Sequence, residues 1–303
     1  MRLTITGADG FVGRAVVRRL RETGAAAELL LVDRAIAEPG PERRLAGDLT
    51  DPAVLAAATR DCDALLHLAA LPGGAAERDP AASRAINLDV PLRLIEAMAG
   101  RRLVLAGSIA VFGAAPAGPI DDASVPVPDS VYGTHKRMVE LAFADAVRRG
   151  AVEGAVLRLP GIVAWPPAAS GFGSAFLSDV FHAAVAGRPY VVPVASDAAS
   201  WLCSVRACAA NLVLALLGKG AERAPVTLPA LRVRMGALVD ALEARLPGAT
   251  LTHAEDPALR HAFASYPPLV TPRAAALGFT AETDVDALLD AVLADLSLHP
   301  TQG

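Results

Sequence analysis

Apolar residues follow two alternating patterns as far as residue 163. Short, nearly continuous apolar runs, typical of strands buried on both faces of a sheet, alternate with longer stretches in which apolar residues recur at helical spacing. The runs predict strands within 2–6, 27–33, 43–52, 63–70, 101–113 and 153–163. The helical spacing predicts helices over 11–20, 51–61, about 80–99 and 132–149. At the start of the helix over 51–61, Asp51 is suited to cap the amino end and Pro52 to occupy the first helical position.

Strands that alternate with helices of this length form parallel sheets wound on both faces. We therefore predict an α/β protein with a doubly wound parallel sheet over residues 1–163. Beyond residue 163 the pattern becomes irregular, with a loop followed by helices within 172–187 and 234–246. No low-complexity linker separates the two parts, so residues 164–303 are expected to form a smaller substrate domain that is partly interleaved with the first.

A glycine turn stands between the first predicted strand and the first predicted helix. Gly7, Gly10 and Gly13 let the backbone turn tightly and approach a pyrophosphate, which the N–H groups at the amino end of the helix bind. Asp33 ends the second strand, where a carboxylate accepts hydrogen bonds from ribose hydroxyls and repels a 2′-phosphate. This pattern predicts a Rossmann-type site for NAD, although Arg34 leaves NADP open. The alternatives are a strand–turn–helix without a ligand and an Asp33 that only ends a surface turn.

Lysine is rare in this chain. Only two lysines occur among its 28 lysines and arginines, and one of them, Lys136, follows Tyr132 by four positions. On a helix the two side chains share one face, where the ammonium favours the phenolate and is expected to lower the pKa of Tyr132. A phenol tuned in this way takes a proton from an alcohol or returns it to a carbonyl. Ser108 follows a strand at the ligand-binding edge of the sheet, where its hydroxyl is suited to hold the substrate oxygen.

Each of these residues also has a purely structural interpretation. A tyrosine stacked on a lysine stem produces the same spacing, and Ser108 also fits a serine that caps a loop. His135, which lies between Tyr132 and Lys136, is interpreted as a solvated helix residue rather than a proton relay, and His67 as a packed strand residue. No spacing among the six histidines indicates a metal site.

Composition narrows the functional classes without naming one. The chain has 303 residues and a formal net charge of -4, and this mild acidity without a basic cluster argues against nucleic-acid binding. Three cysteines without CxxC spacing argue against a disulfide framework or zinc site and favour a reducing compartment. No apolar run reaches membrane-spanning length, and the chain enters a strand at once without a signal peptide, so we expect a cytoplasmic protein.

Together these features resemble the extended short-chain dehydrogenase/reductase family, which includes NAD-dependent sugar epimerases and dehydratases. The matching segments are TGADGFVG, LVD, GDLTD, LLHLAA, INLD, SIAVFG, YGTHK and RLPGIV, in the order of the family. The resemblance implies Ser108, Tyr132 and Lys136 as catalytic residues. It implies NAD as the cofactor, bound by Gly7, Gly10, Phe11, Val12, Gly13, Asp33, Asp48, Leu49, Leu68, Ala69, Ala70, Asn87, Tyr132, Lys136, Pro160 and Ile162.

The resemblance gives parts of this set different roles. Asp48 and Leu49 would flank the adenine, and residues 68–70 would line the path of the pyrophosphate and ribose. Asn87 would support the active-site lysine through water, and residues 160–162 would lie near the nicotinamide.

Within the family, the segments WLCSVRACAANLV and YPPLVTPRAAALGFTA resemble D-erythronate dehydrogenases, which oxidise a secondary alcohol next to a carboxylate. Two departures remove cations from the expected substrate side. Residues 165–167 read Trp-Pro-Pro instead of Arg-Pro-Gly, and residues 198–200 lack an expected arginine. A bidentate guanidinium binds carboxylates well, so its loss opens the site to a less polar substrate. Trp165, Trp201 and Arg206 are the expected substrate contacts, with a structural role as the alternative for each.

The resemblance also implies a homodimer in which the helices at about 84–99 and 133–149 pack as a four-helix bundle. The predicted activity is hydride transfer between NAD and a secondary alcohol or ketone of a small molecule. A nucleotide-sugar epimerase or dehydratase that retains its NAD is the alternative. A third hypothesis is a non-catalytic sensor that only binds the dinucleotide. The presence of both Tyr132 and Lys136 disfavours it.

Overall fold

The computed structural model describes residues 1–24, 28–37, 40–166, 173–218, 222 and 224–298. The chain divides into two compact units. The first comprises residues 1–111, 128–159 and 209–227, and the second comprises 112–127, 160–208 and 228–303. Relative to the expected boundary at residue 163, three stretches change units: 112–127 and 160–163 belong to the second unit, and 209–227 belongs to the first.

The first unit is built on a parallel sheet with seven strands among the described residues, in the order β10-β6-β5-β4-β1-β2-β3. The strands are β1 (Arg2–Thr6), β2 (Glu28–Asp33), β3 (Arg43–Ala46), β4 (Ala64–His67), β5 (Arg102–Ser108), β6 (Glu153–Leu159) and β10 (Val226–Thr227). Every neighbouring pair in this order is parallel. The parallel sheet predicted from the apolar runs is therefore confirmed.

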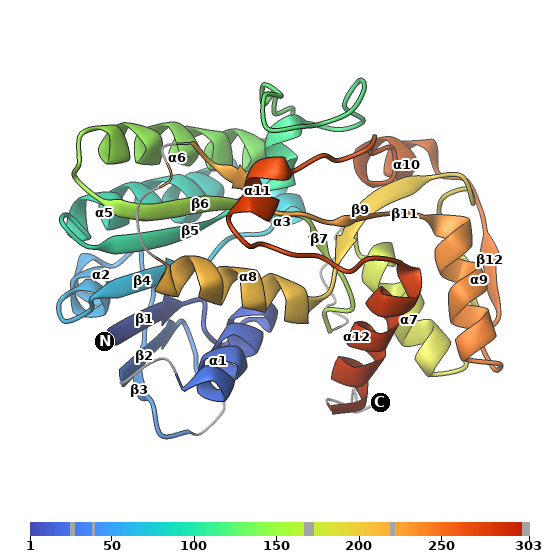
Figure 1. The fold of residues 1–303 in the computed structure, drawn as a ribbon, viewed down its shortest axis with the longest axis horizontal. Coiled ribbons are helices and arrows are strands. Elements are labelled where there is room, and N and C mark those ends of the chain that lie inside the picture. The colour runs from blue at the N-terminus through green and yellow to red at the C-terminus, as the bar shows by residue number, and fades with distance from the viewer. Residues whose placement is uncertain (25–27, 38–39, 167–172, 219–221, 223, 299–303) are drawn as a thin grey trace. The chain divides into compact units, whose positions relative to one another are not determined.

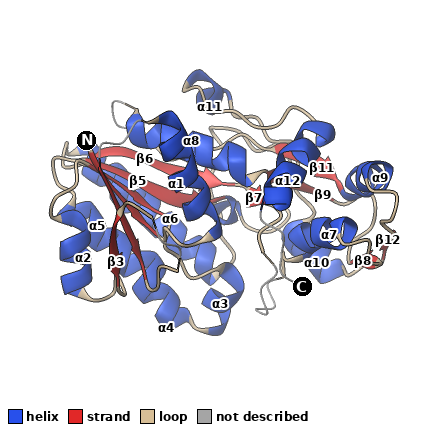
Figure 2. Ribbon diagram, turned by 90° about the horizontal axis from the view of Figure 1, so that it is seen from below, coloured by secondary structure: helices blue, strands red, loops and turns tan. Residues whose placement is uncertain are grey.

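Helices cover both faces of this sheet, as a doubly wound fold requires (Figures 1 and 2). One face carries α2 (Pro52–Thr59), α5 (Val90–Ala97) and α6 (Val131–Arg148), and the other carries α1 (Phe11–Thr23) and α8 (Val205–Leu217). Leu94 of α5 and Phe143 of α6 pack with Leu65 and Leu103 of the sheet in one buried cluster. At the start of α2, Asp51 accepts a hydrogen bond from Ala53 N, which confirms the predicted cap.

The helix predicted over about 80–99 is interrupted. It consists of α4 (Pro80–Ser83), the π-helix η1 (Arg84–Asp89) and α5, and a further helix, α3 (Gly73–Arg78), precedes it. Val90 N bonds to Ala85 O, five residues back, and Pro91 has no N–H to continue an α-helical register. Apolar spacing is similar in both helix types, so the pattern did not reveal the interruption.

The strand predicted over 153–163 is also divided. β6 ends at Leu159, and Pro160 has no N–H for a further ladder bond. Gly161 and Ile162 form β7, which belongs to the second unit and pairs with β9 (Ala199–Cys203). The 3-10 helix η2 (Ile109–Phe112) follows β5 as the loop part of the segment predicted over 101–113.

The second unit contains two small sheets. The mixed sheet has the order β11-β9-β7, with β11 (Leu231–Arg234) antiparallel to β9, and the parallel pair consists of β8 (Tyr190–Val192) and β12 (Leu251–His253). Its helices are α7 (Phe176–Val185), α9 (Met235–Arg245), α10 (Pro257–Phe263), α11 (Pro272–Ala276) and α12 (Val285–Leu298). α7 and α9 confirm the helices predicted within 172–187 and 234–246.

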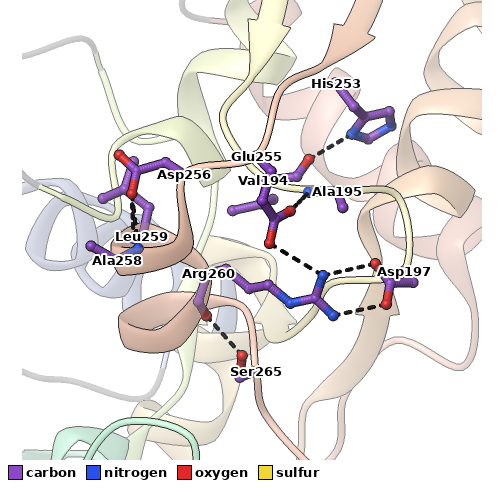
Figure 3. A network of polar contacts seen from close by, with 10 residues as sticks. All are labelled: Val194, Ala195, Asp197, His253, Glu255, Asp256, Ala258, Leu259, Arg260 and Ser265. Atoms are coloured by element: carbon purple, nitrogen blue, oxygen red, sulfur yellow. Dashed lines mark hydrogen bonds and ion pairs between the residues drawn. The ribbon is translucent and has the colours of Figure 1, made fainter.

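A polar network ties α10 to the turn that precedes β9 in the second unit (Figure 3). Arg260 donates to both carboxylate oxygens of Asp197, at 2.9 and 2.8 Å, and to Glu255 at 3.4 Å. Glu255 in turn accepts from Ala195 N at 2.7 Å. These groups are partly exposed, so their ion pairs are expected to add little to the free energy of unfolding. They join the turn to α10.

Among the helices within the described ranges, none combines the length and apolar character that crossing a bilayer demands.

Candidate active site

The glycine turn between β1 and α1 lies in close contact with other backbone segments, which leaves no space for side chains at Gly7 and Gly13. Gly7 has a φ of +72°, and a Cβ there would lie 2.6 Å from Ala69 N. A Cβ on Gly13 would lie 2.1 Å from Gly7 O. The amino end of α1 has no capping side chain and no acidic residue in its first turn. The N–H groups of Phe11, Val12 and their neighbours are therefore suited to an anionic group, as the predicted pyrophosphate site requires.

Asp33 lies at the end of β2, beside this turn. Its Oδ2 accepts from Asp9 N at 2.9 Å, and its Oδ1 accepts from Arg34 N at 2.7 Å. Asp9 is itself paired with Arg14 at 3.2 Å. These bonds hold the Asp33 carboxylate against the turn while leaving lone pairs for further donors, which fits a ribose contact.

Two further predicted segments follow β3 and β4, which lie on either side of β1 and β2 in the sheet. Asp48 Oδ1 accepts from Thr50 N and Thr50 Oγ1, both at 2.8 Å, and these hydrogen bonds lower the pKa of Asp48. Leu49 is buried. Residues 68–70 continue from β4, where Leu68 N bonds to Thr6 O at 2.9 Å. The structure therefore brings residues 68–70 against the glycine turn, as the resemblance implies.

The three expected catalytic side chains meet at the carboxyl end of β5. Ser108 is the last residue of β5, and its side chain lies close enough to the phenol of Tyr132, near the start of α6, to act on the pKa of that phenol. Lys136 Nζ lies 5.5 Å from the centre of the Tyr132 ring, so the two side chains share one face of α6. Lys136 Nζ donates to Ala106 O of β5 at 2.8 Å.

The expected lowering of the Tyr132 pKa is not what the structure shows. Burial raises the pKa of Tyr132 to about 12, and the hydrogen bond from Ser108 opposes this only in part. Burial also lowers the pKa of Lys136 to about 8. The physical reason is that Lys136 is buried and Tyr132 is half-buried, so desolvation disfavours the charged form of each.

Local packing fixes where α6 begins and thus where Tyr132 lies. Ser130 caps the helix by accepting from Gly133 N at 3.1 Å, and Glu77 of α3 accepts from Val131 N at 2.7 Å. A Cβ on Gly133 would lie 2.4 Å from Ala110 O, so only glycine permits this approach of α6 to the segment after β5. The contact of Glu77 with the start of α6 was not predicted from the sequence, because Glu77 lies 54 residues from Val131 along the chain.

A buried ion pair fastens α6 to β6. Arg158 donates from Nε and Nη2 to the two carboxylate oxygens of Glu140, at 2.7 and 2.9 Å, and Arg137 adds a bond of 2.9 Å. Glu140 is fully buried and Arg158 nearly so. Arg158 thus has a structural partner in the first unit.

Two polar residues near the site contact Ser83. The Asn87 side chain bonds to the backbone N and O of Leu71, both at 2.9 Å, and to Ser83 Oγ at 3.0 Å, and its expected support of Lys136 through water stays a prediction. The expectation for His135 is corrected, because His135 is half-buried rather than solvated, with Nδ1 2.9 Å from Ser83 Oγ. The sequence could not reveal this contact, because Ser83 lies 52 residues away along the chain.

His67 is packed in β4, in line with its sequence interpretation. It is 2% exposed, and Nδ1 lies 2.7 Å from Thr6 Oγ1. Burial, with Lys136 nearby, lowers the pKa of His67 to about 3, so the imidazole is neutral. Within the part of the chain that the structure describes, no group of three or more His, Cys, Asp and Glu side chains is arranged to hold a metal ion.

The expected substrate contacts and residues 160–162 lie in the second unit. Trp201 is fully buried, with its ring centre 4.6 Å from that of Tyr266 and its Nε1 donating to Pro267 O at 2.7 Å. Trp165 O accepts from His182 Nε2 at 2.9 Å, and Arg206 is paired with Asp295 at 3.1 Å. These contacts give each residue a structural role, and a substrate role stays a prediction.

Pro160 and Ile162 flank and form β7 of the mixed sheet, with Pro160 buried and Ile162 half-buried. Their expected place near a nicotinamide also stays a prediction. Pro167, which closes the Trp-Pro-Pro departure, lies outside the described residues.

Comparison with known proteins identifies the family of the chain. The model of the NAD dependent epimerase/dehydratase family matches residues 3–221. D-erythronate dehydrogenase of Cupriavidus necator is 33% identical, over 98% of this chain and 99% of the relative. The Haemophilus influenzae D-erythronate dehydrogenase is 30% identical, over 94% and 96%. The structure of a nucleoside-diphosphate-sugar epimerase from Agrobacterium tumefaciens matches with a TM-score of 0.87 and 28% identity, over 99% of this chain and 94% of that one.

Proposed function

This chain belongs to the NAD dependent epimerase/dehydratase family, and we propose from that premise that it transfers a hydride between NAD and a secondary alcohol or ketone. One observation carries the proposal. Ser108, Tyr132 and Lys136 meet at the carboxyl edge of the parallel sheet, with the serine beside the phenol and the ammonium 5.5 Å from the centre of the phenol ring. Ligands of doubly wound folds bind at this edge.

Each of the three residues has a separate task in this proposal. Ser108 orients the reacting oxygen by a hydrogen bond. Tyr132 gives its hydroxyl proton to a ketone oxygen, or takes the proton of an alcohol. Because the pKa of Tyr132 is about 12 in the free protein, the phenol is held as a proton donor there. The charge of Lys136 favours removal of that proton, since it stabilises the phenolate that results.

The cofactor proposed is NAD rather than NADP. When bound, NAD supplies the hydride acceptor and a positive ring that further favours the phenolate. The close approach at Gly7 and the uncapped start of α1 fit its pyrophosphate, and the Asp33 carboxylate fits a ribose and repels a 2′-phosphate. Titration of the protein with NADH and NADPH tests the preference, and tighter binding of NADPH would contradict the role of Asp33.

The substrate proposed is a small secondary alcohol. The D-erythronate dehydrogenases at 33% and 30% identity support a sugar acid, while the two departures over residues 165–167 and 198–200 support a less polar compound. A panel of sugar acids, hydroxy acids and apolar alcohols, followed by the absorbance of NADH, decides between these classes.

Replacement of the phenol tests the proposed catalytic role. Tyr132→Phe removes the exchanged proton, so turnover should fall by at least about 100-fold, the usual contribution of general acid–base catalysis. Binding of NADH should change less than about twofold, because the phenyl ring still fills the site. The matched variant Tyr190→Phe, in β8 of the second unit, should leave turnover unchanged. Wild-type turnover in Tyr132→Phe would exclude the proposed mechanism.

A second candidate function is epimerisation or dehydration of a nucleotide sugar with retained NAD. The Agrobacterium epimerase, with its TM-score of 0.87 at 28% identity, favours this candidate. Such enzymes return the hydride to the substrate, so NADH does not accumulate. Net formation of NADH with a small alcohol supports the dehydrogenase, whereas product formation without NADH supports the epimerase.

A further inference from the structure

Three polar side chains connect α6 to the segment that follows β4. Asn87 Oδ1 accepts from Leu71 N, and Asn87 Nδ2 donates to Leu71 O, both at 2.9 Å. Asn87 Nδ2 also donates to Ser83 Oγ at 3.0 Å, and Ser83 Oγ lies 2.9 Å from His135 Nδ1. Ser83 and Asn87 are 0% and 1% exposed, so bulk water does not compete for these bonds. Because Leu71 directly follows residues 68–70, the connection runs from α6 to the glycine turn.

The backbone of Leu71 fixes the direction of these bonds. Its N–H requires an oxygen and its C=O requires an N–H, so the Asn87 amide has a single orientation. Asn87 Nδ2 therefore donates to Ser83 Oγ, and the Ser83 hydroxyl keeps its own hydrogen to give. Among the residues that the structure describes, the other partner of Ser83 Oγ is His135 Nδ1. This nitrogen accepts the hydrogen when the imidazole is neutral and carries its proton on Nε2.

Protonation of His135 reverses the last of these bonds. A charged imidazole has a hydrogen on both nitrogens, so Ser83 Oγ then faces two donors and its own buried hydrogen loses its acceptor. Burial lowers the pKa of His135; Asp89 opposes the shift, Arg84 adds to it and Glu77 opposes it. These three charged groups come from η1 and α3, which pack against α6 together with α4 and α5.

We propose that His135 is a positioning residue whose neutral imidazole, through Ser83 and Asn87, holds residues 68–71 against the glycine turn, and that its protonation weakens dinucleotide binding. The choice of ligand rests on the proposed function, whereas the bonds themselves belong to the protein alone. His135 acts through other residues, so the KM for the dinucleotide should change with its charge while kcat stays the same.

Titrations of the full chain with NADH between about pH 5 and pH 8 test the proposal. The dissociation constant should rise by about tenfold on the acid side, the factor expected when a buried hydroxyl loses its acceptor. His135→Asn places an amide oxygen near the position of Nδ1 and does not titrate, so it should keep the neutral-pH affinity in acid. His135→Leu has no acceptor and should show the weaker, acid-side affinity at every pH.

Amide hydrogen exchange gives a readout that needs no cofactor. Leu71 N–H is bonded to Asn87 Oδ1, so it should exchange about tenfold faster in His135→Leu than in the wild type near neutral pH, and no faster in His135→Asn. His261→Asn is a matched change at an exposed histidine of α10 and should alter neither readout.

The outcomes separate this inference from the proposed function. An acid-side loss of affinity that persists unchanged in His135→Asn contradicts the proposal, as does equal exchange at Leu71 in His135→Leu and the wild type. A chain that binds no NADH at any pH contradicts the choice of cofactor instead, and the exchange at Leu71 then still decides on His135.

Discussion

At the residue scale, burial of the Lys136 ammonium in the candidate site lowers the stability of the fold at neutral pH. Its amine is 4% exposed and donates to Ala106 O, and burial lowers its pKa to about 8. An ordinary lysine has a pKa of about 10.5, so the charged form present at neutral pH is disfavoured by folding. The proposed reaction needs this charge beside Tyr132. The residue therefore costs stability in order to place a cation next to the phenol.

Lys136→Met should separate these two effects. Because the pKa in the folded state is depressed, the stability that the neutral amine contributes is present above about pH 10.5 and is lost as pH falls through about 8. Methionine fills the same space without a charge, so the free protein should gain roughly 2–3 kcal/mol in its free energy of unfolding at pH 7. Turnover should be lost.

Urea unfolding of the free protein measures this effect, and the gain should shrink as pH rises toward about 10. A variant less stable than the wild type at pH 7 would show that the Ala106 hydrogen bond outweighs desolvation.

At the element scale, the position of α6 relative to the sheet depends on its buried ion pair. Glu140 is fully buried and receives bidentate bonds from Arg158 of β6. Since α6 carries both Tyr132 and Lys136, this pair sets the distance of the two side chains from the end of β5. The ion pair mainly fixes the orientation of α6, because a buried ion pair adds little net stability compared with apolar residues of similar size.

Removal of one partner should be far more harmful than removal of both. Arg158→Met leaves the Glu140 carboxylate buried with only Arg137, and the free energy of unfolding should fall by about 3–5 kcal/mol. The double variant Glu140→Leu with Arg158→Met should recover most of this loss but lower turnover. Urea denaturation measures both. The control is Arg148→Met, which breaks an exposed pair with Asp145 on the same helix and should cost less than about 1 kcal/mol.

Elements defined by contacts within a few residues were predicted from the sequence, whereas elements defined by contacts between distant residues were not. β1, the glycine turn and α1 were predicted because apolar spacing and glycine geometry act within a few residues. η1 was missed, since its π register depends on Pro91 and on the packing of Asn87, and apolar spacing does not distinguish it from an α-helix. β7 was assigned to the wrong sheet, because its partner β9 lies about 40 residues further along the chain.

The candidate site divides in the same way. Ser108, Tyr132 and Lys136 were found from a short motif at a strand end. Glu77 and Ser83, which position α6 and His135, were missed because they lie 54 and 52 residues from their partners. In the free protein, burial shifts the pKa of Tyr132 upward, opposite to the shift predicted for the site with its cofactor, because desolvation depends on packing that a sequence does not show.

At the scale of the whole molecule, one face of α6 in the first unit exposes two apolar side chains. Met138 is 46% and Leu141 is 56% exposed, and they follow one another at helical spacing between the polar Thr134 and Asp145. The opposite face of α6 packs on the sheet through Val139 and Phe143. Exposed apolar side chains on a helix that is already anchored are suited to a helix–helix interface between two copies of a chain.

We therefore expect a homodimer in solution, as the family resemblance implies. Met138→Glu with Leu141→Glu places two like charges on each copy of this face, and both would have to be desolvated on association, so the dimer should dissociate to monomers at micromolar concentration. Light scattering after gel filtration measures the mass. Val191→Glu, at a position 55% exposed on β8, introduces the same charge elsewhere and should leave the dimer intact. A wild-type chain that is monomeric would contradict the expectation. NADH binding by the charged variant would show that the site forms within one copy.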